Sequence, residues 1–193
     1  MISAILLAAG QSKRMNGENK LTKEIQGIPL IKLSVKNILA SSINELIIVL
    51  GHQKEIIEQL IEKLIDKNNK IKCVFNKDFE SGMASSIKVG LKHLPKNTEA
   101  FFICLGDMPM ICHDIYNQLI KSKDNKEIIV PTYKGQQGNP VLFSILMKDK
   151  IMNIEGDLGA KKILEANKDK ILNLAINDEG VIKNYNSVND FVN

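Results

Sequence analysis

Short, nearly continuous apolar runs alternate along the chain with longer segments in which apolar residues recur every three or four positions. The short runs are typical of buried strands, and the longer segments are typical of amphipathic helices that cover a sheet. The predicted strands span residues 2–7, 46–50, 72–75, 100–105, 127–130, 141–143 and 171–176, with Pro131 ending the strand at 127–130. One predicted helix begins at Pro29, and the others span residues 54–65, 85–94, 114–121 and 158–166.

This alternation predicts an α/β fold with three layers, α/β/α, in which helices cover both faces of a mostly parallel, mixed sheet. The 193 residues are enough for one well-buried domain and too few for two ordinary ones. Because no stretch has the composition of a linker, we expect a single domain over residues 1–193. Sheets of this kind bind ligands at the carboxyl ends of their strands, where the connecting loops gather.

Composition narrows the class of protein further. Hydrophobic residues make up 44% and charged residues 25%, which is ordinary for a globular protein and excludes a disordered chain. No apolar run approaches the roughly 20 residues of a membrane helix, and no basic region precedes the apolar N-terminal segment, so we expect a cytoplasmic protein without a membrane partner. The net charge is only +4, aromatic residues make up 5%, and no basic block is present, which disfavours nucleic acid as a partner.

The loop after the first predicted strand is rich in small residues, in particular Ala8-Ala9-Gly10. Small residues allow the backbone to approach a ligand closely, and successive N–H groups in such a turn bind anions. Arg14 and Lys20 add two cations, and Arg14, the only arginine in the sequence, offers a forked contact to phosphate. The loop matches neither a P-loop nor the GxGxxG dinucleotide pattern. It indicates a triphosphate site, with an ordinary basic surface loop as the alternative.

Asp107 directly follows the predicted strand at 100–105, within the sequence Gly-Asp-Met-Pro. A carboxylate at the carboxyl end of a strand, across from a phosphate-binding loop, suits Mg²⁺ that also contacts phosphate oxygens. The alternative is an aspartate that caps the next helix or turn. The residues alone leave both interpretations open.

The segment 7–21, Leu-Ala-Ala-Gly-x-Ser-x-Arg-Met followed by Asn-Lys-Leu, resembles the signature loop of GT-A-like nucleotidyltransferases. More narrowly, it is similar to the molybdenum cofactor cytidylyltransferase and guanylyltransferase family. Further segments resemble motifs of that family in the same order. They are Asn-x-x-Phe-x-Ser-Gly-Met-x-Ser-Ser-Ile from residue 76, Gly-Asp-Met-Pro from 106, Gly-Asn-Pro-Val-Leu-Phe from 138 and Gly-Asp-x-Gly-Ala-Lys from 156.

The resemblance implies a GT-A-like fold and the transfer of CMP from Mg²⁺-CTP to the phosphate of the molybdopterin cofactor, with release of pyrophosphate. Ala-Ala-Gly in the first loop favours CTP over GTP. In this family pattern Arg14 binds the β- and γ-phosphates, Lys20 neutralises the α-phosphate and Asp107 holds Mg²⁺. The implied nucleotide-binding residues are Leu7, Ala8, Ala9, Gly10, Arg14, Lys20, Gly82, Ser85, Ser86 and Gly106. The implied acceptor-binding residues are Asn139, Pro140, Asp157 and Lys161, and the implied metal ligands are Asp107 and Asn186.

The sequence departs from the family pattern in three places. The stretch from Arg14 to Gly17 is one residue longer than the family's Arg-Met-Gly, so the loop before Lys20 must bulge. Lys161 replaces an arginine and loses its forked contact, and Asn186 stands where relatives carry an acidic residue. The alternatives are the same chemistry on a sugar, alditol or choline phosphate or with GTP, and a nucleotide-binding cofactor chaperone without catalysis. Transient contact with a molybdoenzyme or its maturation factor is also expected.

Overall fold

The computed structural model describes residues 1–12, 18–154, 156, 161–186 and 190. Within these residues the strands of the main sheet run in the order β10-β7-β9-β6-β1-β4-β5, and β8 pairs with β7. The strands are β1 (Ile2–Ala8), β4 (Glu45–Leu50), β5 (Ile71–Phe75), β6 (Ala100–Leu105), β7 (Ile128–Tyr133), β8 (Gln136–Gln137), β9 (Val141–Ser144) and β10 (Ile171–Ala175). Strands β2 (Glu24–Ile25) and β3 (Ile28–Pro29) form a separate hairpin.

The pairing of the strands confirms the predicted mixed, mostly parallel sheet. Strand β1 pairs in parallel with β4 and β6, β4 with β5, and β10 with β7. Strand β9 runs antiparallel to both of its neighbours, β6 and β7. Strand β1 therefore lies between two parallel neighbours in the interior of the sheet, where both of its faces are covered.

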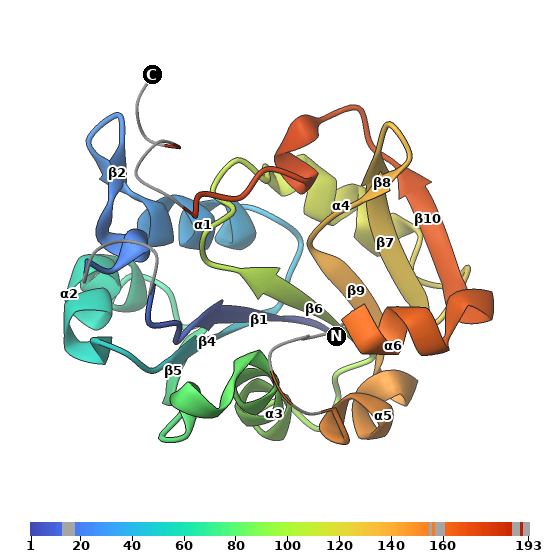
Figure 1. The fold of residues 1–193 in the computed structure, drawn as a ribbon, viewed down its shortest axis with the longest axis horizontal. Helices are drawn as coiled ribbons and strands as arrows, with labels where there is room; N and C mark the ends of the chain where they lie inside the picture. The colour runs from blue at the N-terminus through green and yellow to red at the C-terminus, as the bar shows by residue number, and fades with distance from the viewer. Residues whose placement is uncertain (13–17, 155, 157–160, 187–189, 191–193) are drawn as a thin grey trace.

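Helices cover both faces of the sheet, as the three-layer prediction requires (Figure 1). The helices are α1 (Leu30–Leu39), α2 (Lys54–Ile65), α3 (Met83–Lys92), α4 (His113–Lys121), α5 (Lys148–Met152) and α6 (Lys161–Ala166), and the short 3-10 helices are η1 (Lys20–Thr22), η2 (Phe79–Ser81), η3 (Ile145–Met147), η4 (Lys168–Lys170) and η5 (Glu179–Val181). Helices α1, α2 and α4 contribute to one core, and α3, α5 and α6 to the other. Adjacent strand residues such as Phe101 and Phe102 enter opposite cores, which explains the continuous apolar runs.

Most predicted elements are confirmed, and α2 and β6 have the predicted ends. The prediction that Pro131 ends its strand is wrong, because β7 continues to Tyr133. Strand β9 pairs with β7 only at Ile128 and Ile129, so a proline beyond them removes no donor from that ladder. The first three residues of the helix predicted at 158–166 lie outside the described residues. No helix in the described part of the chain is long and apolar enough to span a membrane.

Helix α3 approaches β1 so closely that one position requires glycine. A Cβ atom built on Gly90 would lie 2.3 Å from Cγ2 of Ile5. In a helix, alanine is otherwise favoured over glycine by about 1 kcal/mol. Whether Gly90→Ala lowers or raises the free energy of unfolding therefore shows whether the clash with Ile5 outweighs this preference. We expect Gly90→Ala to lower the free energy of unfolding by about 1–3 kcal/mol, because the core is overpacked.

The measurement is urea-induced unfolding followed by circular dichroism. Lys88→Ala on the same helix is the matched control and should change stability by no more than about 0.5 kcal/mol. A Gly90→Ala variant more stable than the unaltered protein would contradict this packing.

Candidate active site

A cavity of about 420 Å³ opens at the carboxyl ends of β1 and β6, a volume typical of small-molecule sites. Leu7 and Leu105 lie opposite each other in the parallel ladder, and the N–H of Gly106 donates to the carbonyl of Leu7 at 3.1 Å. The two loops singled out in the sequence therefore leave the sheet side by side. The lining residues are Leu7, Ala9, Gly10, Gln11, Ser12, Lys20, Leu21, Phe79, Glu80, Gly82, Met83, Ser86, Leu105, Gly106, Asp107, Asn184 and Asn186.

The loop after β1 presents Lys20 to this cavity through local hydrogen bonds. Ser12 Oγ accepts from the backbone N–H of Lys20 at 3.0 Å, which joins the two flanks of segment 13–17. Asn19 caps η1, its Oδ1 accepting from the N–H of Leu21 at 3.1 Å. The capped turn directs Leu21 into the core and the Lys20 side chain into the cavity. Arg14 lies outside the described residues.

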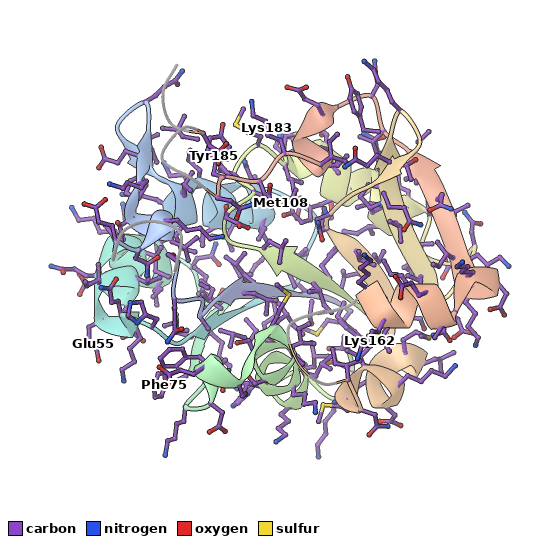
Figure 2. All side chains as sticks on the ribbon, in the orientation of Figure 1. Glu55, Phe75, Met108, Lys162, Lys183 and Tyr185 are labelled. Carbon is purple, nitrogen blue, oxygen red and sulfur yellow. The ribbon has the colours of Figure 1, made fainter. Side chains whose placement is uncertain are left out.

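The loop after β6 is held by side chains of α1 and by the C-terminal segment. Ser34 Oγ donates to the carbonyl of Gly106 at 3.0 Å, and Asn37 Nδ2 donates to the carbonyl of Pro109 at 2.8 Å. The N–H of Tyr185 donates to the carbonyl of Asp107 at 2.9 Å, and Tyr185 and Met108 lie in the same region of Figure 2. The N-cap of α4 is Cys112, not Asp107. The backbone on both sides of Asp107 is therefore held in place, and its side chain lines the cavity.

Lys20, Asp107 and Asn186 meet in the cavity although they are far apart in the sequence. Lys20 Nζ forms an ion pair with Asp107 Oδ2 and donates to Asn186 Oδ1 at 3.0 Å. The exposed fractions of the Lys20 and Asp107 side chains are 22% and 10%, so both charges are largely removed from solvent. The longer loop before Lys20 thus does not prevent its ammonium group from reaching the carboxylate.

The same two oxygens fit a divalent cation. They already converge on one cation, the Lys20 ammonium, and a carboxylate and an amide oxygen are ligands that Mg²⁺ accepts. In the described part of the chain no three His, Cys, Asp or Glu residues form a metal-binding group. The arrangement suits a cation that is held by one or two protein oxygens and otherwise by substrate phosphates.

The other end of the cavity is formed by η2 and the start of α3. Gly82 has φ of +110°, a conformation that favours glycine, and it leads into α3. Ser86 lines the cavity, whereas the hydroxyl of Ser85 donates to backbone carbonyls and Ser85 is not among the lining residues. Gln11 Nε2 donates to Glu80 Oε1 at 2.7 Å, which links the loop after β1 to η2.

Of the predicted acceptor-binding residues that the structure describes, Asn139, Pro140 and Lys161, none is among the residues that line this cavity. Pro140 is buried, and the backbone N–H of Asn139 donates to the carbonyl of Val181 at 2.8 Å. The Lys161 side chain on α6 is 73% exposed, and its Nζ lies 4.0 Å from Glu165 Oε1. Asp157 lies outside the described residues. One backbone hydrogen bond connects the two regions, because the N–H of Ala84 in α3 donates to the carbonyl of Gly156 at 3.0 Å.

Several residues that shape the site carried no recognisable signal in the sequence. Ser34 and Asn37 belong to an ordinary amphipathic helix, whereas Asn184, which also lines the cavity, lies in the same C-terminal segment as the predicted Asn186. Among the predicted nucleotide-binding residues, Ala8 and Ser85 do not line the cavity. Whether such residues reach the cavity depends on tertiary contacts, which local sequence patterns do not encode.

Cys104 lies on β6 two residues before Gly106, yet it offers no nucleophile. Burial raises the pKa of the Cys104 thiol to about 12, against a smaller lowering by the hydrogen bond with Tyr116. Burial also raises the pKa of the Tyr116 phenol well above its usual value. Both groups stay protonated at neutral pH, and they belong to the core rather than to the chemistry of the cavity.

The fold and the cavity define an α/β protein with a site for a small molecule at the carboxyl ends of its strands. The solved structure of a nucleotidyl transferase from Methanothermobacter thermautotrophicus superposes with a TM-score of 0.84 at 18% identity, covering 100% of this chain and 94% of that one. The model of the MobA-like NTP transferase domain matches residues 4–171, and the chain belongs to this family. The resemblance inferred from the motifs is thereby confirmed.

Two curated relatives carry the names of molybdenum cofactor nucleotidyltransferases. The molybdenum cofactor cytidylyltransferase of Escherichia coli is 32% identical over 143 residues, which are 74% of this chain and 70% of that protein. The probable molybdenum cofactor guanylyltransferase of Methanosarcina acetivorans is 26% identical over 155 residues, which are 79% of this chain and 67% of that protein.

Removing the Lys20 ammonium group should free the oxygens of Asp107 and Asn186 for another cation. We expect Lys20→Met to bind Mn²⁺ in the absence of nucleotide at least about tenfold more tightly than the unaltered protein, because two cations so close together repel. Electron paramagnetic resonance of free Mn²⁺ measures this affinity.

Lys23→Met is the matched control, since the Lys23 ammonium pairs with Glu18 instead, and its Mn²⁺ affinity should equal that of the unaltered protein. Adding Asp107→Asn to Lys20→Met should abolish the gain. Equal Mn²⁺ affinities of Lys20→Met and the unaltered protein would show that these oxygens do not form a cation site.

Proposed function

We propose that this protein transfers CMP from CTP to the phosphate of the molybdenum-molybdopterin cofactor and releases pyrophosphate. The observation that carries the proposal is the convergence of Lys20, Asp107 and Asn186 on one cavity at the carboxyl ends of β1 and β6. A cation beside a carboxylate and an amide oxygen suits a triphosphate with its metal. The 32% identical cytidylyltransferase and the Ala-Ala-Gly sequence of the first loop support CTP as the donor.

The proposed reaction is an in-line displacement without a covalent enzyme intermediate. An oxygen of the cofactor phosphate forms a bond to the α-phosphorus of CTP, and the bond from that phosphorus to the pyrophosphate oxygen breaks. The attacking phosphate is already ionised at neutral pH, so no general base is required. The chain contributes positioning and charge neutralisation.

Each residue near the phosphates has a proposed role. Lys20 leaves Asp107 and Asn186 and donates to the α-phosphate, while Arg14 binds the β- and γ-phosphates through its fork. Asp107 and Asn186 hold the divalent cation, which when bound supplies charge neutralisation to the phosphate oxygens. Gly10 and Gly106 line the cavity, and their backbone is proposed to contact the nucleotide.

The remaining parts of the proposal concern the other substrate and the setting. The acceptor is proposed to bind beside segments 138–143 and 156–161, with Asp157 and Lys161 contributing to its recognition. The hydrogen bond from Ala84 to Gly156 would then connect acceptor and nucleotide. We further propose that residues 1–193 act as one domain in the cytoplasm, and that the product passes to a molybdoenzyme or its maturation factor.

GTP is the second candidate donor, which the 26% identical guanylyltransferase of Methanosarcina acetivorans favours. The test is pyrophosphate release with each of the four nucleoside triphosphates and Mg²⁺, with and without the molybdopterin cofactor. Pyrophosphate release with CTP that depends on the cofactor supports the proposal. Pyrophosphate release with GTP instead of CTP supports GTP as the donor. Binding of CTP without release under any condition would contradict catalysis.

The carboxylate of Asp107 should be essential for this turnover. We expect Asp107→Ala to lower cofactor-dependent pyrophosphate release by at least about a hundredfold, because the phosphates lose their metal ligand. Asp114→Ala is the matched control, since that carboxylate is 71% exposed on α4 and does not line the cavity. The Asp114→Ala variant should retain the rate of the unaltered protein. Equal rates for both variants would show that Asp107 does not belong to the active site.

A further inference from the structure

Asn76 is a buried polar residue at the end of β5 to which the motif resemblance assigns no role. Its exposed fraction is 1%, and its backbone N–H extends the sheet by donating to the carbonyl of Leu50 at 2.8 Å. Because a buried amide requires partners for both its oxygen and its nitrogen, the direction of each hydrogen bond is informative.

One neighbour fixes the orientation of this amide. The backbone N–H of Asp78 donates to Asn76 Oδ1 at 3.0 Å, and a backbone N–H can only donate. The nitrogen of the amide therefore faces α3, where Nδ2 donates to Ser85 Oγ at 2.8 Å and to Ser86 Oγ at 3.0 Å. Both serine oxygens act as acceptors toward Asn76.

The hydroxyl hydrogens of the two serines then have different partners. Ser85 donates to the carbonyl of Asp78 at 2.9 Å or of Gly82 at 2.8 Å. Ser86 is 5% exposed and lines the cavity, and none of the described residues supplies an acceptor for its hydroxyl hydrogen. The Ser86 O–H is left for a group inside the cavity.

We propose that Asn76 is a positioning residue that fixes Ser86 as a hydrogen-bond donor to an acceptor atom on the base or ribose of the bound nucleotide. This assignment rests on the proposed function, and it places the nucleoside at the α3 end of the cavity, which Gly82 and Ser86 line. Cytosine offers O2 and N3 as acceptors. Asn76 does not line the cavity, so it acts through Ser86 and not by contact with the nucleotide.

A double-mutant cycle tests this dependence. We expect Asn76→Ala and Ser86→Ala each to raise the Kd for Mg²⁺-CTP about tenfold, measured by isothermal titration calorimetry. In the Ser86→Ala background, Asn76→Ala should raise the Kd less than about twofold, because the hydroxyl that it orients is gone. If Asn76 served stability alone, its replacement would weaken binding by the same factor in both backgrounds, which would overturn the assignment.

A matched control and a second variant separate affinity from folding. Ser81→Ala removes an exposed hydroxyl that donates to the same Asp78 carbonyl, at 2.7 Å, and it should leave the Kd unchanged. If Asn76→Ala fails to fold, Asn76→Asp is the second variant, because aspartate has the same shape but accepts the Ser86 hydroxyl hydrogen. Asn76→Asp should also raise the Kd, and this increase should vanish in the Ser86→Ala background. Unaltered protein that binds no nucleoside triphosphate would overturn the proposed function as well, whereas CTP binding with additive losses would overturn only the role of Asn76.

Discussion

The parallel pairing of β1 with β6 determines where the two loops of the site leave the sheet. It places Leu7 opposite Leu105 in the ladder, so the loops that carry Lys20 and Asp107 leave the sheet as neighbours. Both strands lie in the interior of the sheet and are buried from both faces. The hydrophobic burial of these strands therefore positions the polar groups of the site. Helix α1 adds rigidity, since Ser34 and Asn37 hold the backbone of the loop after β6.

The polar groups of the cavity form a small, mutually dependent set. Asp107 is largely withdrawn from water, and a carboxylate in that position requires a cationic partner. In this structure Lys20 supplies it, and Asn186 provides the second oxygen. The Lys20 ammonium occupies the place that suits a metal ion, so under the proposed function a metal–triphosphate complex binds only when this side chain moves.

Local patterns of the sequence predicted the fold well because buried parallel strands produce continuous apolar runs that few other structures share. They also predicted that the loop with Lys20 and the loop with Asp107 lie at the carboxyl ends of such strands, across from each other. They did not predict the strand through Pro131, which depends on where its neighbour β9 stops pairing. Nor did they distinguish Ser86 from Ser85 or give Asn76 a role, because hydrogen-bond direction between segments is a tertiary property.

The proposed function depends on Asp107 and Asn186 as the metal ligands beside a bound nucleoside triphosphate. The most direct measurement is the anomalous scattering of Mn²⁺ in crystals grown with a non-hydrolysable CTP analogue. We expect a peak in contact with both side-chain oxygens and with phosphate oxygens, and we expect Lys20 Nζ to have turned from Asp107 toward the α-phosphate. A nucleotide bound in the cavity with Mn²⁺ elsewhere, or with Lys20 still paired to Asp107, would contradict the proposed function.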